Sequence, residues 1–376
     1  MVEPFRVSVG EDVLADLRAR LRATRWPDPA PGPAWSQGTD LHYLRDLVRE
    51  WADTFDWRSQ ERRLNAYDHF TTVIDGARTH FVHRRTGRPA LVLAHGWPSC
   101  FVEMLPLVDR LSDEFDLVVP SLPGYVFSSR PEGAGVDTRR VAAMWLELMS
   151  RLGYERFGVV GGDFGAAVAT HLALLAPERV RGILLTTPEV SPVLGPDSPP
   201  LSPAERAYLA HVERWDATER GYSAIQSTRP QTLGYGLADS PAGLAAWLVE
   251  KWRAWSDSGG DLDTHPGRDV MLTVLTLYWA TNSITSSVRD YYDNRWHGTA
   301  LTSADRVQVP TAVSVFAHEH VPEGEPPREW FERLYDVRQW SVSPRGGHFA
   351  AIEAPEVLAE DVRRHFSRDG AASSGE

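Results

Sequence analysis

The chain has little of what disulfide-linked, secreted or membrane-spanning proteins need. Among its 376 residues Cys100 is the only cysteine, so no internal disulfide can form, and a single thiol fits a reducing compartment. The longest apolar runs, such as residues 90–94 and 182–185, are far shorter than the roughly 20 residues that cross a bilayer. The first residues lack the basic and then apolar pattern of a signal peptide. We therefore expect a cytoplasmic protein without a membrane anchor.

Positive charge is also scarce. The 39 basic residues are outnumbered by 51 acidic ones, which gives a net charge of −12. This charge disfavours binding to nucleic acid or to an anionic membrane, so neither is expected as a partner. Lys251 is the only lysine among the basic residues, and we attribute this to the codon usage of a GC-rich genome rather than to chemistry. The 14 tryptophans, in contrast, favour large apolar cores and aromatic-lined pockets.

Residues 1–66 are expected to form a helical N-terminal arm. Val13, Leu14, Leu17 and Leu21 recur at the spacing that places side chains on one face of a helix. A second amphipathic stretch covers residues 41–51, and a proline-rich break at 27–33 separates the two. Because this segment carries no chemical motif of its own, we expect an arm that packs on the main domain.

From residue 67 the pattern becomes that of an α/β fold. An Asp75-Gly76 pair between two alternating stretches, 70–74 and 79–84, predicts a β-hairpin. Apolar strands are then expected at 90–94, 116–120, 157–160 and 180–186, with helices at 102–111, 138–152 and 165–175 between or after them. Continuous apolar strands that alternate with helices indicate a mostly parallel sheet with helices on both faces.

The alternation stops at residue 188, which divides the predicted core in two. Residues 67–187 form its first part, and residues 188–305, rich in proline, tryptophan and tyrosine, are expected to form an inserted helical cap. The second part, 306–368, contains strands at 312–316 and 339–342 and a last helix at about 354–366. Residues 369–376 are small and polar and are expected to form a flexible tail.

One strand-to-helix turn carries the most informative residue. The segment at 157–166 has the layout of a nucleophile elbow, in which a sharp turn exposes one side chain at the start of a helix. Serine usually occupies this position, but here it is Asp163, with glycines at 161, 162 and 165. A carboxylate there can attack a saturated carbon and become an ester itself. The alternative interpretation is a structural aspartate that caps the helix.

Two further loops complete a catalytic constellation. His95-Gly96-Trp97-Pro98 follows an apolar strand, where the backbone N–H groups of Trp97 and Phe164 would form an oxyanion hole and the two side chains would line the pocket. His348 lies on a glycine loop after the last strand and is the candidate base. Glu319 follows the preceding strand and is the candidate acid. Glu323, Glu325 and Glu329 are weaker alternatives because they lie further from the end of that strand.

The His318-Glu319-His320 sequence also raises the question of a metal site. Two imidazoles two residues apart can chelate a metal ion, but a third ligand cluster and a helical HExxH motif are missing. We therefore expect no metal.

Taken together, the chain resembles the epoxide hydrolases of the α/β-hydrolase superfamily, specifically the microsomal type with an N-terminal arm. The resemblance covers nearly the whole chain. The segments that carry it are Asp56-Trp57-Arg58 with Glu61 and Leu64-Asn65, His95-Gly96-Trp97-Pro98, Pro120-Ser121-Leu122-Pro123-Gly124-Tyr125, Gly161-Gly162-Asp163-Phe164-Gly165, Gly221-Tyr222 with Ile225-Gln226, Asp239-Ser240-Pro241, and Gly346-Gly347-His348-Phe349.

The resemblance implies a mostly parallel eight-stranded sheet and a set of catalytic residues. Asp163 would be the nucleophile, His348 the base and Glu319 its acid. Two cap tyrosines would hold the epoxide oxygen. Tyr222 matches the first, and Tyr292 is favoured over Tyr291 for the second. We expect a member without the apolar anchor of the membrane-bound type, and Phe164 stands where many members have tryptophan.

The expected reaction converts an apolar or aromatic epoxide and water into a vicinal diol through an ester on Asp163, without a cofactor. A haloalkane or haloacid dehalogenase would use the same aspartate, but it would need halide-binding donors in place of the tyrosine pair. A non-catalytic binding protein on the same scaffold would normally have lost one member of the constellation. Detoxification and secondary metabolism both remain open as biological roles, and a homodimer is possible.

Overall fold

The computed structural model describes residues 1–186, 190–319 and 326–367. The predicted tail at 369–376 and the first two residues of the predicted cap, 188 and 189, therefore lie outside the described residues. Within the described residues, nine strands form one sheet in the order β1-β2-β3-β5-β4-β6-β7-β8-β9. The strands are β1 (Glu3–Phe5), β2 (His69–Ile74), β3 (Ala77–Arg84), β4 (Ala90–Ala94), β5 (Asp116–Pro120), β6 (Phe157–Gly161), β7 (Val180–Leu185), β8 (Val307–His318) and β9 (Tyr335–Gly347).

The sheet is mostly parallel, as expected. Strands β4 to β9 pair in parallel, whereas β1, β2 and β3 add an antiparallel edge beside β5. The predicted hairpin is confirmed, because Asp75 and Gly76 join β2 to β3 with positive φ angles of 52° and 70°. Strands β2 to β9 make up the expected eight. The short strand β1, which comes from the arm, adds a ninth.

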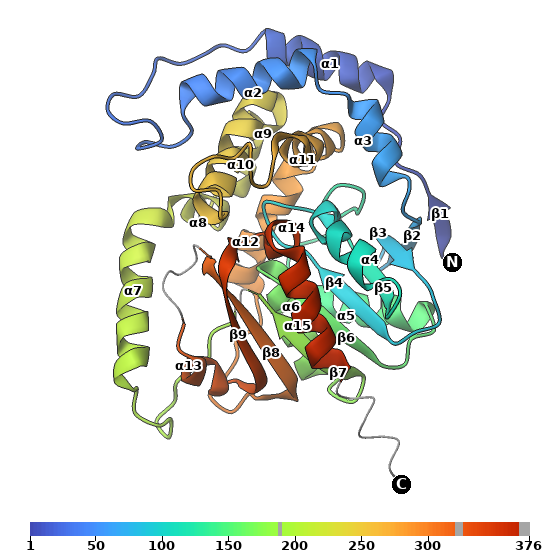
Figure 1. Ribbon diagram of the computed structural model, residues 1–376, viewed down its shortest axis with the longest axis vertical. Coiled ribbons are helices and arrows are strands. Elements are labelled where there is room, and N and C mark those ends of the chain that lie inside the picture. The colour runs from blue at the N-terminus through green and yellow to red at the C-terminus, as the bar shows by residue number, and fades with distance from the viewer. Residues whose placement is uncertain (187–189, 320–325, 368–376) are drawn as a thin grey trace.

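Helices cover both faces of this sheet (Figure 1). Helices α5 and α6 pack together on one face, and α4 and α15 pack together on the other. The helices of the core are η1 (Phe101–Met104), α4 (Leu105–Leu111), α5 (Thr138–Arg151), α6 (Phe164–Leu175), α13 (Arg328–Glu332), α14 (Ala350–Glu353) and α15 (Pro355–Phe366).

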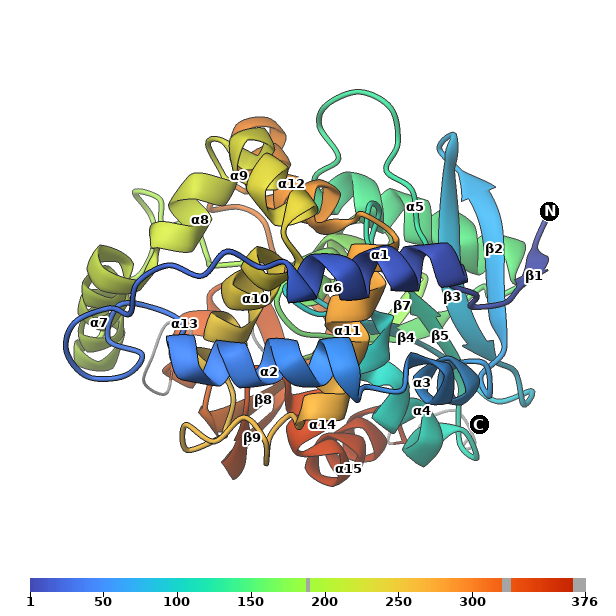
Figure 2. The same cartoon turned by 90° about the horizontal axis from the view of Figure 1, so that it is seen from above.

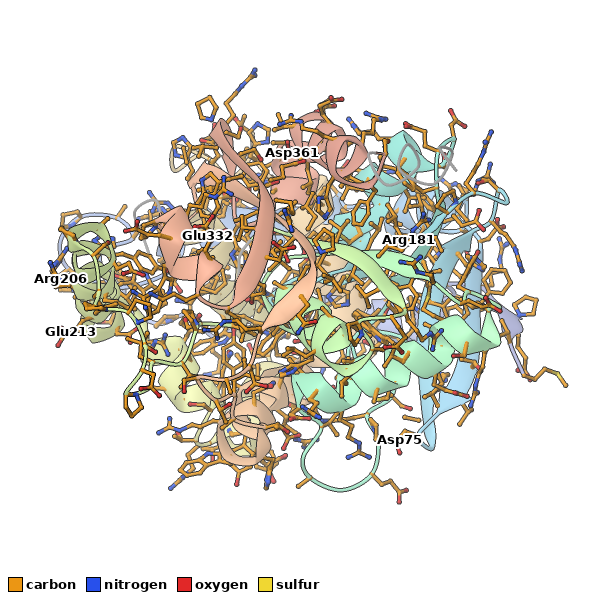
Figure 3. The ribbon with its side chains drawn as sticks, turned by 90° about the horizontal axis from the view of Figure 1, so that it is seen from below. Asp75, Arg181, Arg206, Glu213, Glu332 and Asp361 are labelled. Carbon is orange, nitrogen blue, oxygen red and sulfur yellow. The ribbon has the colours of Figure 1, made fainter. Side chains whose placement is uncertain are left out.

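The segment between β7 and β8 is helical, as the cap prediction requires. Its helices are α7 (Pro203–Glu219), α8 (Gly221–Gln226), α9 (Pro230–Asp239), α10 (Pro241–Trp255), α11 (Arg268–Ala280) and α12 (Ile284–His297). Helix α9 contacts α8, α10 and α12, so these four form one group. Helix α7 stands at the edge of the molecule, where Figure 3 labels Arg206 and Glu213.

The arm contributes helices α1 (Glu11–Arg22), α2 (Leu41–Asp53) and α3 (Trp57–Leu64). We expected it on the main domain, but α1 and α2 lie against α10 of the cap, and α1 also contacts α11 (Figure 2). The Thr39 hydroxyl donates to the Ala246 carbonyl at 2.6 Å, and the buried Trp51 indole donates to Thr276 at 2.8 Å. The arm therefore braces the cap, while its strand β1 pairs with the sheet.

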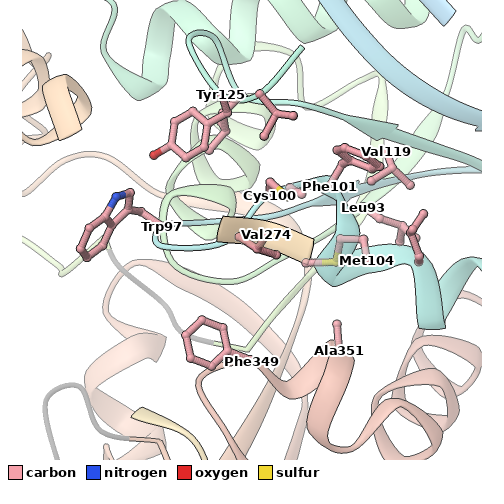
Figure 4. Close-up of a cluster of buried hydrophobic side chains, with 14 of the residues drawn as sticks. Leu93, Trp97, Cys100, Phe101, Met104, Val119, Tyr125, Val274, Phe349 and Ala351 are labelled. Atoms are coloured by element: carbon pink, nitrogen blue, oxygen red, sulfur yellow. The ribbon is translucent and has the colours of Figure 1, made fainter. Parts of the chain in front are cut away.

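A continuous apolar core fills the space between the sheet and its helices (Figure 4). Cys100 and Phe101 lie in this core, directly after the loop that follows β4. Burial raises the pKa of the Cys100 thiol to about 12, so the thiol stays protonated. Among the described helices, none combines the length and the apolar character needed to cross a membrane.

Candidate active site

The predicted elbow is formed by β6, Asp163 and α6. Asp163 has φ 52° and ψ −131°, a conformation that non-glycine residues rarely adopt and that often marks a functional site. The turn requires Gly165, because a Cβ there would lie 2.2 Å from the carbonyl oxygen of Ala94. Asp163 also occupies the N-cap of α6. Helix capping therefore accounts for the position of Asp163 at the start of α6, but it does not account for the strained backbone conformation of this residue.

The two carboxylate oxygens of Asp163 have different surroundings. Oδ1 accepts hydrogen bonds from the backbone N–H groups of Trp97, at 2.9 Å, and Phe164, at 2.6 Å. Oδ2 lies 3.7 Å from Nε2 of His348. Oδ1 is thus held in a site for a negatively charged oxygen, and Oδ2 remains to act on a ligand.

His348 and Glu319 come together at the ends of neighbouring strands. Glu319 directly follows β8 and His348 directly follows β9, and Nδ1 of His348 lies 2.9 Å from Oε1 of Glu319. The backbone N–H of His348 donates to the Trp255 carbonyl at 2.8 Å, at the end of cap helix α10. The structure therefore brings Asp163, His348 and Glu319 into one chain of contacts.

The charges around His348 favour its protonated form. Burial alone would lower the pKa of His348, but the negative charges of Glu319, Asp163 and Glu103 outweigh it and raise the pKa to about 10. Burial raises the pKa of Asp163, whereas His348 and the two N–H donors act in the opposite direction. The negative charges around His348 therefore stabilise its imidazolium form.

Among the described residues, none of the weaker candidates for the acid takes the place of Glu319 beside His348. Glu323 and Glu325 lie outside the described residues, as does His320. Glu329 accepts a hydrogen bond from Ser202 instead. His318 pairs with Asp257 at 3.3 Å, and no group of three possible metal ligands occurs among the described residues.

Aromatic side chains from the cap close over Asp163. The ring of Tyr222, from α8, stacks on Trp97 with 5.7 Å between centroids and an interplanar angle of 6°. The ring of Tyr291, from α12, lies 5.6 Å from Trp97, 5.0 Å from Phe164 and 5.9 Å from Tyr222. Tyr222 and Tyr291 thus stand side by side at the nucleophile.

The choice of Tyr292 was wrong. Its ring contacts Trp296 and His297 on its own helix, and it lines a separate cavity beside Arg229. Successive residues on a helix point about 100° apart, so only one of two adjacent tyrosines can face the nucleophile. That residue is Tyr291.

The cavity above Asp163 has a volume of about 540 Å³, within the usual range for small-molecule sites. Its lining residues are Asp163, Phe164, Trp215, Arg220, Tyr222, Ser223, Ala224, Ser227, Trp255, Tyr291, Asn294, Arg295 and His348. Phe164 lines the cavity as expected. The Trp97 side chain does not, because it is fully buried behind Tyr222 and Tyr291.

The sequence reasoning missed two buried carboxyl groups close to His348. Burial raises the pKa of Glu103, in η1, to about 7, and that of Glu353, in α14, also to about 7. The backbone N–H of Phe349, next to His348, donates to Glu353 at 2.9 Å. For Glu103 the available signal was a single acidic residue inside the apolar stretch 100–105.

The fold and the elbow define an α/β-hydrolase with an aspartate at the nucleophile position. Comparisons with known proteins agree: a family model of the α/β-hydrolase fold matches residues 89–222, and a model of the epoxide hydrolase N terminus matches residues 2–104. The chain belongs to the epoxide hydrolase family, whose members are hydrolases that act on ether bonds and use an aspartate nucleophile.

The relatives cover almost the entire chain. A Stigmatella aurantiaca protein that is named, provisionally, as an epoxide hydrolase is 40% identical over 97% of this chain and 84% of its own length. Pig epoxide hydrolase 1 is 34% identical over 96% of this chain and 88% of its own length. The crystal structure of juvenile hormone epoxide hydrolase from the silkworm Bombyx mori superposes with a TM-score of 0.88 at 30% identity, covering 98% of this chain and 94% of that one. These relatives do not favour the dehalogenase alternative.

Proposed function

We propose that this enzyme converts an apolar or aromatic epoxide to a vicinal diol through an ester formed on Asp163. One observation carries the proposal: Oδ1 of Asp163 accepts two backbone N–H groups, while Oδ2 lies near His348 in a cavity that also holds two tyrosines. A carboxylate held in this way presents one oxygen for attack and keeps the other in a site that can later stabilise an oxyanion.

In the first step Oδ2 of Asp163 attacks one carbon of the epoxide ring. The ring C–O bond breaks, and the departing oxygen takes its proton from the hydroxyl of Tyr222 or Tyr291. Such general acid catalysis contributes roughly 10²–10⁴ to the rate. The product is a glycol monoester of Asp163.

In the second step His348 removes a proton from a water molecule, which attacks the ester carbonyl. Esterification neutralises Asp163, one of the negative charges that raise the pKa of His348, so this pKa falls. The imidazolium then gives its proton to the tyrosinate left by ring opening, and the neutral imidazole takes a proton from water. Glu319 keeps the Nδ1 side of the ring fixed, so that Nε2 faces the ester. The N–H groups of Trp97 and Phe164 then stabilise the oxyanion formed at Oδ1.

The cavity supports an apolar or aromatic substrate. The wall around Asp163 is built from the rings of Phe164, Tyr222, Trp255 and Tyr291. Rings of this kind bury apolar surface and stack on a planar substituent. A compact apolar epoxide such as styrene oxide is therefore a suitable probe.

A single turnover in oxygen-18 water tests the covalent route. The first diol should contain no label, because its new oxygen comes from Asp163, and the label should appear in the carboxylate of Asp163. Label in the first diol would show direct attack by water. Asp163→Ala should be inactive, and His348→Gln should accumulate the ester, detected as a mass increase of the intact protein.

We also propose a cytoplasmic location and a homodimer for this enzyme. A cytoplasmic location is supported by the single cysteine, Cys100, which is buried as a protonated thiol. The homodimer stays a prediction, and light scattering on the purified protein tests it.

A further inference from the structure

The one lysine of the chain lies directly behind the active site. Lys251 is on cap helix α10, one helical turn before Trp255, and its side chain is only 10% exposed. Its Nζ atom lies 4.5 Å from the ring centroid of Tyr222 and 5.9 Å from that of Trp255. Lys251 is not among the residues that line the cavity. Its charge therefore acts on the aromatic wall and not on the substrate directly.

Codon usage explains why arginine replaces lysine elsewhere, but it does not explain this exception. Every other basic residue in the chain is an arginine. Either cation can lie over an aromatic ring, but a guanidinium is planar and wide, whereas an ammonium is a compact point charge. The one lysine, Lys251, thus stands where its ammonium faces the ring of Tyr222 in the pocket wall.

The neighbours of Tyr222 fix its ring from several sides. Trp97 stacks on it at 5.7 Å, and Trp255 meets it edge-on with centroids 5.3 Å apart. Lys251 adds a cation to this set of contacts, and Glu250 forms an ion pair with Lys251 at the outer side. Glu250 is the more exposed partner of that pair and offsets part of the ammonium charge, whereas the ring of Tyr222 lies on the buried side of Lys251.

We propose that Lys251 is a positioning residue that holds the ring of Tyr222 and strengthens its hydroxyl as a proton donor to the departing epoxide oxygen. This inference rests on the proposed function. A cation over the ring stabilises negative charge as it develops on the phenol oxygen during proton transfer. The effect is specific to ring opening, because hydrolysis of the ester depends on His348 and not on Tyr222.

The test separates the two steps in single-turnover kinetics with styrene oxide. Lys251→Met should slow ester formation about tenfold, the equivalent of about 1.4 kcal/mol, and leave ester hydrolysis within about twofold of wild type. The alkaline limb of the ester-formation profile should move to higher pH. Lys251→Gln should repeat the loss, and Lys251→Arg should recover part of the rate because it restores a more diffuse charge.

Two controls identify the contact responsible. In a Tyr222→Phe background, Lys251→Met should have no further effect on ester formation, because the hydroxyl on which Lys251 acts is already gone and Tyr291 is the remaining donor. Arg253→Met removes a cation from the same helix that lies over Trp35, 4.6 Å from its ring, and should leave ester formation unchanged. Melting curves of each variant check that the fold is intact.

The results distinguish this inference from the function on which it rests. If wild type yields diol but Lys251→Met and Lys251→Gln form the ester at the wild-type rate, the role of Lys251 is refuted. The role of Lys251 is also refuted if Lys251→Met slows ester formation as much in the Tyr222→Phe background as in wild type. Equal slowing of ester formation and ester hydrolysis refutes it too. If wild type forms no diol from any epoxide, the proposed function fails instead.

Discussion

Replacing Tyr291 by phenylalanine removes one hydroxyl from the cavity and keeps the ring that packs on Trp97 and Phe164. A hydrogen bond to a charged group is worth about 1.5–3 kcal/mol, which corresponds to roughly 10- to 150-fold in rate. Tyr222 remains as a second donor, with its ring centroid 5.9 Å from that of Tyr291. We therefore expect Tyr291→Phe to slow ester formation by roughly 10- to 150-fold and the double variant with Tyr222→Phe to lose roughly 10²–10⁴.

The assay is stopped-flow fluorescence under single-turnover conditions, since the fully buried Trp97 and the cavity-lining Trp255 lie close to the ester. Tyr292→Phe is the matched control. It makes the same chemical change one residue along the same helix, in a ring that faces Trp296 instead of the nucleophile. Its ester formation should stay within about twofold of wild type. If Tyr292→Phe were the slower variant, the assignment of Tyr291 would be refuted.

Three further predictions concern the surroundings of the nucleophile. Gly96→Ala should abolish ester formation without unfolding the protein, because the new Cβ would lie 2.4 Å from the nucleophile's Cβ; Gly236→Ala, which has open space around it, is the activity control. Arg130→Met should lower the free energy of unfolding by about 3–5 kcal/mol in denaturant titrations, because it leaves two buried carboxylates on α12 unpaired; a loss below 1 kcal/mol would contradict this. Glu319→Gln should lower the pKa of His348 from its value of about 10, because the carboxylate charge that raises it is gone, and slow ester hydrolysis more than ester formation. NMR titration of the His348 imidazole measures the change in pKa, and single-turnover kinetics measure the rates of the two steps. An unchanged pKa would show that the ion pair with Glu319 does not raise the pKa of His348.

The parts of the site that depend on local sequence could be predicted. The elbow at Asp163 is specified within ten residues by an apolar strand, three glycines and a helix start. His348 and Glu319 follow neighbouring parallel strands, and the ends of such strands meet at one edge of a sheet. Strand order and chain order therefore sufficed to bring these three residues together.

The second tyrosine could not be chosen in this way. Tyr291 and Tyr292 have the same chemistry, and which of them faces Asp163 depends on how α12 is rotated about its axis. Packing against α8 and α9 and the buried Arg130 sets this rotation, and those contacts join segments far apart in the chain. When the match to a family is uncertain by one residue, the predicted direction of a helical side chain changes by about 100°. This change is enough to exchange a pocket residue for an outward-facing one.

The arm belongs to the scaffold of the active site even though none of the described lining residues of the cavity comes from it. The N–H of His348 is held by the carbonyl of Trp255, the last residue of α10. The same helix carries Lys251, behind Tyr222. Thr39 in the arm donates to a carbonyl in the middle of α10, and helices α1 and α2 cover its outer side. A displacement of α10 would move the anchor of the base and the cation behind the proton donor together. The arm therefore helps to fix the geometry of both chemical steps through one helix.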